Sequence, residues 1–149
     1  MKFPTMFATM VGGAAALSAI IAPQAASAAP DVSTTVNLAT QLCLDGSGNG
    51  QVHTAHCDGG SHQRWNVFYG NYGWRFQNMG TWRCLDSKHQ DYTVTTPCDQ
   101  ASTQEWQVTE DQFGKKVKNL ATGKCLDSNA YGEVYTIDCN DGKNQRWTF

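Results

Sequence analysis

The feature that most constrains this chain is an internal repeat with a period of 41 residues, present three times without an insertion. Each copy holds Cys-Leu-Asp, a threonine, a second cysteine and a Gln-x-Trp triplet at constant spacing. The first residues of these four elements are Cys43, Thr54, Cys57 and Gln63 in the first copy, Cys84, Thr95, Cys98 and Gln104 in the second, and Cys125, Thr136, Cys139 and Gln145 in the third. Such periodicity indicates one supersecondary unit built three times around a common core.

Alternating side chains predict that the repeat consists of β-strands. Inward positions should keep their residue type between copies, whereas outward positions should vary. The positions expected inside are Val52, Thr93 and Val134 with Thr54, Thr95 and Thr136, and those expected outside are His53, Val94 and Tyr135 with Ala55, Thr96 and Ile137. The Trp residues of the triplets alternate likewise and are expected in the core. No stretch has sustained helical periodicity, so the chain is predicted to be all-β.

Three such units could form propeller blades or a closed barrel. Propellers need at least four blades, and three would leave exposed sheet edges. A barrel with threefold symmetry is therefore favoured, with repeats at about 33–73, 74–114 and 115–149. The first and last strands should pair to close it. Its core should combine the Trp side chains with Leu44, Leu85 and Leu126.

The first 28 residues are predicted to be a signal peptide. Lys2 is their only charge, residues 11–21 are apolar, and Ala26-Ser27-Ala28 has the small-x-small pattern of a cleavage site. The apolar run is too short for a membrane anchor, which needs about 20 residues. Residues 29–149 should form one secreted, extracellular domain without membrane insertion. The net charge of −2 for the whole chain gives no reason to expect a nucleic-acid partner.

Six cysteines in an exported chain of this size predict disulfides. About 15 pairings are possible in principle, and the repeat selects one because each copy holds two cysteines at the same separation. The predicted disulfides are Cys43–Cys57, Cys84–Cys98 and Cys125–Cys139. Each contributes about 3 kcal/mol in the chain-entropy model. The spacing and the oxidising destination argue against zinc, and no metal and no cofactor are predicted.

Three copies of Cys-Leu-Asp followed by Gln-x-Trp resemble the ricin-B-type lectin domains, which are β-trefoils. The resemblance covers the mature chain and implies a carbohydrate-binding protein without enzymatic activity. The third repeat is most similar to small secreted members that bind high-mannose glycans. In this family the Asp of Cys-Leu-Asp accepts hydrogen bonds from sugar hydroxyls. An outward residue of the next strand covers the C–H face of the ring, and the loop before Gln-x-Trp adds polar contacts.

Carried over residue by residue, the resemblance implies one credible sugar site. Its residues, all in the third repeat, are Asp127, Tyr135, Ile137, Asn140, Asn144 and Gln145. The other two repeats lack the aromatic residue and are expected to be degenerate or altered in specificity. Their weaker candidates are Asp45, His53 and His62 in the first repeat and Asp86 and Thr103 in the second. The aspartates and the triplet glutamines could also have structural roles, in which their side chains form hydrogen bonds with the backbone of the loops.

Two further features lie outside the repeat pattern. His53, His56 and His62 crowd the first repeat and could hold a metal or titrate with pH, although histidines in polar loops are usually just solvated. Trp82 occupies the turn position that Gln41 and Gly123 hold in the sister repeats. We expect Trp82 to be exposed, either contacting a partner or packing over its own hairpin.

The preferred hypothesis is a lectin for mannose- or galactose-type glycans or polysaccharides, acting mainly through the third repeat. The alternative is a trefoil with decayed sugar sites that binds another protein, as an inhibitor, a toxin-associated subunit or an adhesin. The lost aromatics of two repeats and the extra Trp82 favour that alternative. An enzyme is a distant third, because a glycosidase needs two facing carboxyl groups that the repeat does not identify.

Overall fold

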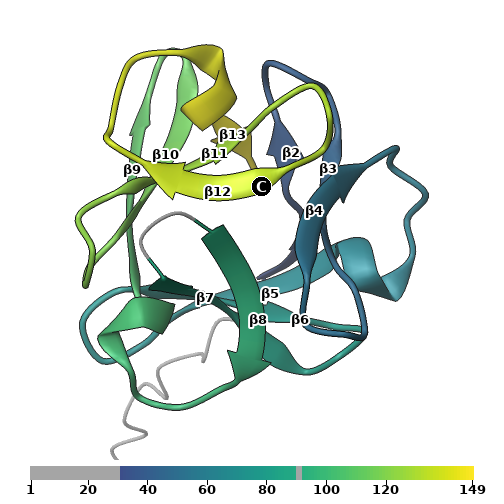
Figure 1. Ribbon diagram of the computed structural model, residues 1–149, viewed down its shortest axis with the longest axis vertical. Helices are drawn as coiled ribbons and strands as arrows, with labels where there is room; N and C mark the ends of the chain where they lie inside the picture. Colours follow the sequence, from purple (N-terminus) through teal and green to yellow (C-terminus); the bar gives the residue numbers. More distant parts are fainter. Residues whose placement is uncertain (1–30, 90–91) are drawn as a thin grey trace, which may run out of the picture.

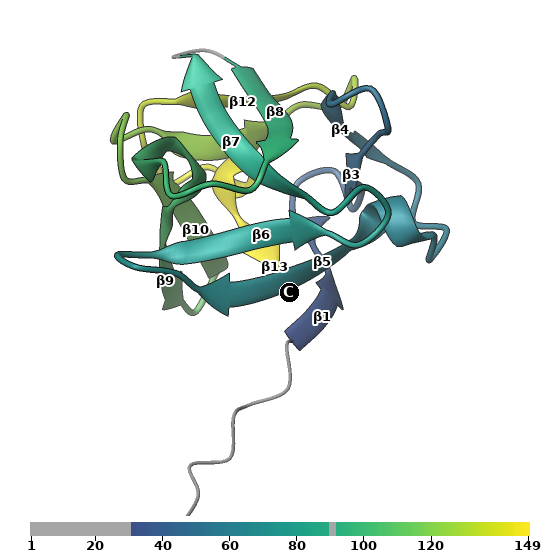
Figure 2. The same cartoon turned by 90° about the horizontal axis from the view of Figure 1, so that it is seen from below.

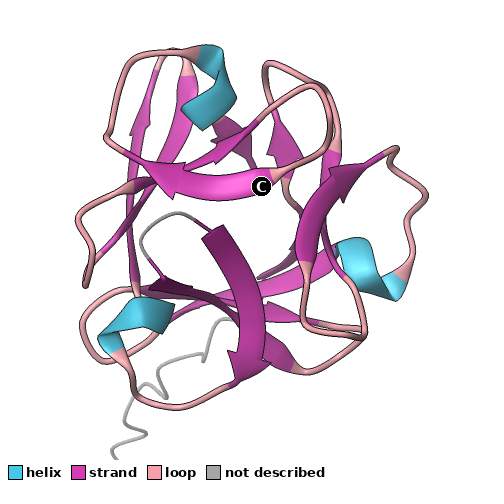
Figure 3. Ribbon diagram, in the orientation of Figure 1, coloured by secondary structure: helices cyan, strands magenta, loops and turns pink. Residues whose placement is uncertain are grey.

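The computed structural model describes residues 31–89 and 92–149, so the predicted signal peptide lies outside the described residues. Three lobes surround a pseudo-threefold axis and follow one another along the chain (Figure 1). Each lobe carries one short 3-10 helix on its outer side (Figure 3). These helices are η1 (Ser61–Gln63), η2 (Ser102–Gln104) and η3 (Lys143–Gln145). No helix of the described residues is long and apolar enough to cross a membrane.

One end of the molecule is a barrel of antiparallel strands (Figure 2). Its strands are β1 (Asp31–Thr34), β2 (Val36–Asn37), β5 (Arg64–Tyr69), β6 (Trp74–Asn78), β9 (Trp106–Asp111), β10 (Gly114–Asn119) and β13 (Trp147–Thr148). Neighbouring repeats join where β5 pairs with β6 and β9 pairs with β10, whereas β6 pairs with β9 and β10 pairs with β13 within one repeat. Strand β13 also pairs with β2, and β1 pairs with β5. The first and last strands therefore close the barrel, as predicted.

Three hairpins, one from each repeat, cover the other end of the barrel. They are β3 (Cys43–Gly46) with β4 (Val52–Ala55), β7 (Arg83–His89) with β8 (Tyr92–Pro97), and β11 (Cys125–Ser128) with β12 (Val134–Ile137). In each hairpin the Asp of Cys-Leu-Asp lies opposite an outward residue of the second strand. The pairs are Asp45 with His53, Asp86 with Val94, and Asp127 with Tyr135.

The core has the predicted composition. The three Trp and three Leu side chains of the repeats are fully buried. Each indole Nε1 donates to the carbonyl oxygen of the Leu in its own repeat, so every buried indole N–H is satisfied. These bonds run from Trp65 to Leu44 at 2.9 Å, from Trp106 to Leu85 at 3.2 Å, and from Trp147 to Leu126 at 3.1 Å. The predicted inward positions of β4, β8 and β12 are buried as well.

The three predicted disulfides are all present, Cys43–Cys57, Cys84–Cys98 and Cys125–Cys139. Each links the first strand of a hairpin to the loop that follows the second strand. The disulfide therefore holds the start of that loop against the hairpin, close to the Asp of Cys-Leu-Asp. No cysteine of the described residues is free.

Buried hydroxyls around the axis break the threefold symmetry. Thr54 Oγ1 lies 2.8 Å from Ser128 Oγ, and Thr136 Oγ1 lies 3.1 Å from Ser87 Oγ. The third pair would join Thr95 to position 46, which is a glycine, and Thr95 Oγ1 is buried without a partner. A Cβ at Gly46 would lie 2.8 Å from Asn78 Nδ2, so the local packing leaves no room for a serine there. The buried threonine hydroxyl of the second repeat thus lacks the hydrogen bond that its counterpart in the third repeat makes.

Candidate functional site

The third repeat brings Asp127, Tyr135 and Ile137 onto one face of the β11–β12 hairpin. Asp127 pairs directly with Tyr135, and Ile137 lies two residues further along the same strand. Asp127 is 3% exposed, whereas Ile137 is 37% exposed. Burial raises the pKa of the Tyr135 phenol above 10.0, and the charge of Asp127 with its hydrogen bond to the phenol raises it further. The hydroxyl therefore stays protonated at neutral pH and serves as a donor to the carboxylate.

Helix η3 supplies the polar edge of this site. Asn144 Nδ2 donates to the carbonyl oxygen of Ser128 at 2.6 Å and so holds η3 against β11, beside Asp127. Gln145 is fully buried, with Nε2 donating to Asp138 O at 3.0 Å and Oε1 accepting from Asn140 N at 2.8 Å. Gln145 thus positions the loop rather than facing a ligand. Asn140 is exposed in that loop, and its Oδ1 accepts from the backbone N–H of Gly142 at 2.8 Å.

The second repeat has the same aspartate in a closed arrangement. Thr96 Oγ1 donates to Asp86 Oδ2 at 2.6 Å, and Gln104 Nε2 donates to both Thr96 Oγ1 at 2.7 Å and Asp86 Oδ2 at 3.3 Å. Asp86 Oδ1 is buried and has no partner. Asp86 Oδ2 therefore already accepts two hydrogen bonds within its own repeat, which lowers its capacity to accept from a ligand. Thr103 contributes its carbonyl oxygen to Asn119 Nδ2 at 2.8 Å, which is a contact between repeats.

The first repeat has an aspartate whose carboxylate is free to accept hydrogen bonds, but a different residue lies opposite it. Asp45 is half-buried and makes no side-chain hydrogen bond or ion pair with the described residues, and it faces His53. His62 lies against the turn of the next repeat, because a Cβ at Gly80 would come within 2.6 Å of His62 Cδ2. The histidines therefore do not converge. No group of His, Cys, Asp and Glu in the described part of the chain could hold a metal ion.

Trp82 is 63% exposed, in agreement with the sequence. Its backbone is in the left-handed region with φ 60°, and the equivalent residues Gln41 and Gly123 have φ 58° and 71°. The left-handed backbone of this turn was not predicted, although Gly123 at the same position in the third repeat was a signal for it. A bulky residue is unfavourable in that region, so Trp82 combines local strain with an exposed indole.

Hairpins that each present an aspartate beside an outward residue, mounted on a closed barrel, define a β-trefoil of the lectin type. The model of the ricin-type β-trefoil lectin domain matches residues 32–147, and the chain belongs to this family. It is therefore a carbohydrate-binding module of the ricin B type. No curated protein sequence matches the chain significantly.

Solved structures share the fold at low sequence identity. The designed threefold symmetric protein ThreeFoil has a TM-score of 0.70 and 21% identity, over 76% of this chain and 94% of that protein. The Macrolepiota procera ricin B-like lectin, solved with lactose, has a TM-score of 0.69 and 18% identity, over 80% and 94%. An exo-β-1,3-galactanase from Clostridium thermocellum has a TM-score of 0.71 and 20% identity, and there the match covers 78% of this chain but only 29% of the enzyme.

Proposed function

We propose that this protein is a secreted, non-enzymatic lectin for mannose- or galactose-type glycans, with its main sugar site on the third repeat. One observation carries the proposal: Asp127 lies beside a tyrosine and an isoleucine, while the equivalent Asp86 is already bonded to Thr96 and Gln104. A carboxylate offers about four acceptor positions. No side chain of the described residues other than Tyr135 bonds to Asp127, which leaves acceptor positions for sugar hydroxyls.

Each residue of the site has a distinct role in this proposal. Asp127 accepts charge-assisted hydrogen bonds from two neighbouring sugar hydroxyls. Tyr135 and Ile137 supply apolar surface for the C–H face of the ring. The amides of Asn144 and Asn140 border the ring, and Gln145 acts indirectly by fixing the loop between them. One shallow site buries little area, so affinity for a monosaccharide should be weak and repetitive glycans should gain by avidity.

Secretion of the protein is consistent with the disulfides of the described domain. Three disulfides are stable in an oxidising compartment, and a signal peptide over residues 1–28 would deliver the chain there. We keep protein binding as a second candidate function because Trp82 is exposed on a strained backbone. Exposed Trp residues are frequent anchors of protein interfaces.

The proposal is tested by a glycan array with the mature, disulfide-intact protein, its Asp127→Asn variant and the matched Asp86→Asn variant. We expect one glycan class to bind the wild type and Asp86→Asn, and to be lost with Asp127→Asn. Thermal unfolding of all three proteins shows whether a loss of binding comes from unfolding. If the wild type binds no glycan, or if Asp127→Asn binds as well as the wild type while folded, the third-repeat site is wrong. A sugar-insensitive protein partner captured through Trp82 would then favour the second candidate.

A further inference from the structure

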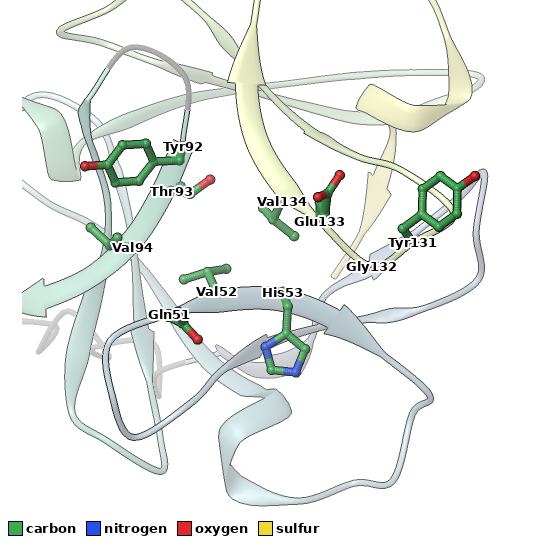
Figure 4. Close-up of a pocket in the computed structure, with 10 residues that line it drawn as sticks. All are labelled: Gln51, Val52, His53, Tyr92, Thr93, Val94, Tyr131, Gly132, Glu133 and Val134. Atoms are coloured by element: carbon green, nitrogen blue, oxygen red, sulfur yellow. The ribbon is translucent and has the colours of Figure 1, made fainter.

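A hollow also lies near the pseudo-threefold axis, and its lining does not include Asp127, Tyr135 or Ile137. It is a hollow of about 450 Å³ between the starts of β4, β8 and β12, so all three repeats line it. Its volume is in the range of small-molecule sites. Figure 4 shows Val52, Thr93 and Val134 directed toward one another in its centre, with Glu133 beside Val134 and His53 pointing away.

Thr93 is the unusual member of this trio. The equivalent inward residues of the sister repeats are valines, and all three positions are buried. Thr93 is 4% exposed, yet its Oγ1 has no hydrogen-bond partner in the described part of the chain. The hydroxyl points away from β8, toward the Val134 side of the hollow (Figure 4). Both sister repeats carry a valine at this position. The unpaired Thr93 hydroxyl therefore gives the lining of the hollow a hydrogen-bond donor that could serve a ligand.

The remaining groups define what that partner must be. Two valine side chains form an apolar floor, so the buried part of the ligand must carry a methyl-sized apolar group next to an acceptor for the Thr93 hydroxyl. Glu133 lines the hollow, where its Oε2 accepts from Asn129 Nδ2 at 2.6 Å and its Oε1 makes no hydrogen bond or ion pair with the described residues. Glu133 can therefore accept an N–H or O–H from the ligand. No Lys or Arg of the described residues lines the hollow.

We infer that the axial hollow binds the acetamido group of an N-acetylated amino sugar. The methyl group packs against Val52 and Val134, and the acetamido oxygen accepts a hydrogen bond from Thr93 Oγ1. The amide N–H or a neighbouring ring hydroxyl donates to Glu133. This site is separate from the one proposed on the third repeat, and neither depends on the other.

The test is an NMR titration of the mature protein with N-acetylglucosamine, with glucose as the probe that lacks the acetamido group. We expect N-acetylglucosamine to shift the backbone amides of Thr93 and Val134, and glucose to leave them unchanged. Thr93→Val copies the residue of both sister repeats, so it should fold. It should weaken binding about tenfold through loss of one hydrogen bond. Thr93→Ser, which keeps the hydroxyl, should retain binding, and Asp127→Asn should bind as the wild type does.

Three outcomes would overturn the inference. The inference is wrong if N-acetylglucosamine shifts no axial amide, if Thr93→Val binds as tightly as the wild type, or if N-acetyllysine binds where the amino sugar does not. The last result would assign the hollow to acetylated side chains instead. Because Asp127→Asn abolishes only the third-repeat site, failure of one site is distinguishable from failure of the other.

Discussion

The second and third repeats hold the same aspartate at the same place in the hairpin, and yet it has different bonding partners in the two repeats. Asp86 and Asp127 both lie in Cys-Leu-Asp-Ser, both face the second strand of a hairpin, and both are 3% exposed. Two neighbours on the second strand differ: Val94 and Thr96 stand where the third repeat has Tyr135 and Ile137. The threonine hydroxyl binds Asp86 and uses its acceptor capacity internally. The comparison teaches that the residue two positions from the ring contact decides whether the carboxylate is available to a sugar.

The largest expected effect is on the stability of the second repeat. Thr96→Val removes the hydroxyl that serves both Asp86 and Gln104, so the free energy of unfolding should fall by about 1–3 kcal/mol. Urea unfolding measures this. The matched change Ile137→Val should cost less, since that side chain has no polar partner and is partly exposed. Equal stability of Thr96→Val and the wild type would mean that the closed arrangement of Asp86 is absent in solution.

The reciprocal change, in the third repeat, should make the Asp127 carboxylate less available to a sugar. Ile137→Thr places a hydroxyl where Thr96 stands in the second repeat, from which it can donate to Asp127 and compete with sugar hydroxyls. We expect glycan affinity to fall about tenfold, which is the value of one hydrogen bond. Calorimetric titration with the glycan identified on the array measures the change, with Ile137→Val as the control that keeps affinity. Undiminished affinity of Ile137→Thr would show that this position does not govern access to Asp127.

The turns before Cys-Leu-Asp give a smaller difference between the same two repeats. The third repeat has Gly123 at the left-handed position, whereas the second has Trp82. Trp82→Gly relieves backbone strain but increases the entropy of the unfolded chain, so we expect a net gain of about 0.5–1 kcal/mol. Thermal unfolding measures it, and glycan binding through the third repeat should not change. A loss of stability would show that the indole packs over its own hairpin.

The smallest effect concerns the phenol beside Asp127. Its raised pKa means that, as the pH rises through 10.0, tyrosine ionises in the unfolded chain before it does in the folded one. The stabilisation is complete below that pH and is lost above it. Wild type should therefore lose stability more steeply than Tyr135→Phe between about pH 9 and 11. Parallel stability profiles for the two proteins would contradict the contact with Asp127.

Much of the architecture could be predicted because the repeat exposes it. Three aligned copies identify the buried Trp and Leu residues, the disulfide pairs and the inward strand positions, all of which depend on patterns that recur. The bond between Thr96 and Asp86 could not be predicted, because an outward threonine can direct its hydroxyl to solvent or to the carboxylate. The odd threonine among two valines at position 93 was visible, but only the structure shows that its hydroxyl is buried and unpaired.

The residue inside each Gln-x-Trp triplet was also missed. Glu105 is 1% exposed, and its carboxylate accepts from the Arg75 guanidinium and from the backbone N–H of Tyr72, which fixes the β5–β6 turn. The sequence held a signal, since the other two triplets carry Arg64 and Arg146 at this position. A charge reversal within a repeat indicates a local partner of opposite charge, but it does not identify Arg75.

The most direct test of the account is a crystal structure of the mature protein with an oligosaccharide that it binds on the array. The account predicts that a sugar ring lies on the β11–β12 hairpin, with hydroxyls bonded to Asp127 and the ring against Tyr135. It predicts no sugar at Asp86, where the bond from Thr96 should persist. A sugar bound to Asp86, or one bound only elsewhere with Asp127 untouched, would contradict the claim that the third repeat is the open site.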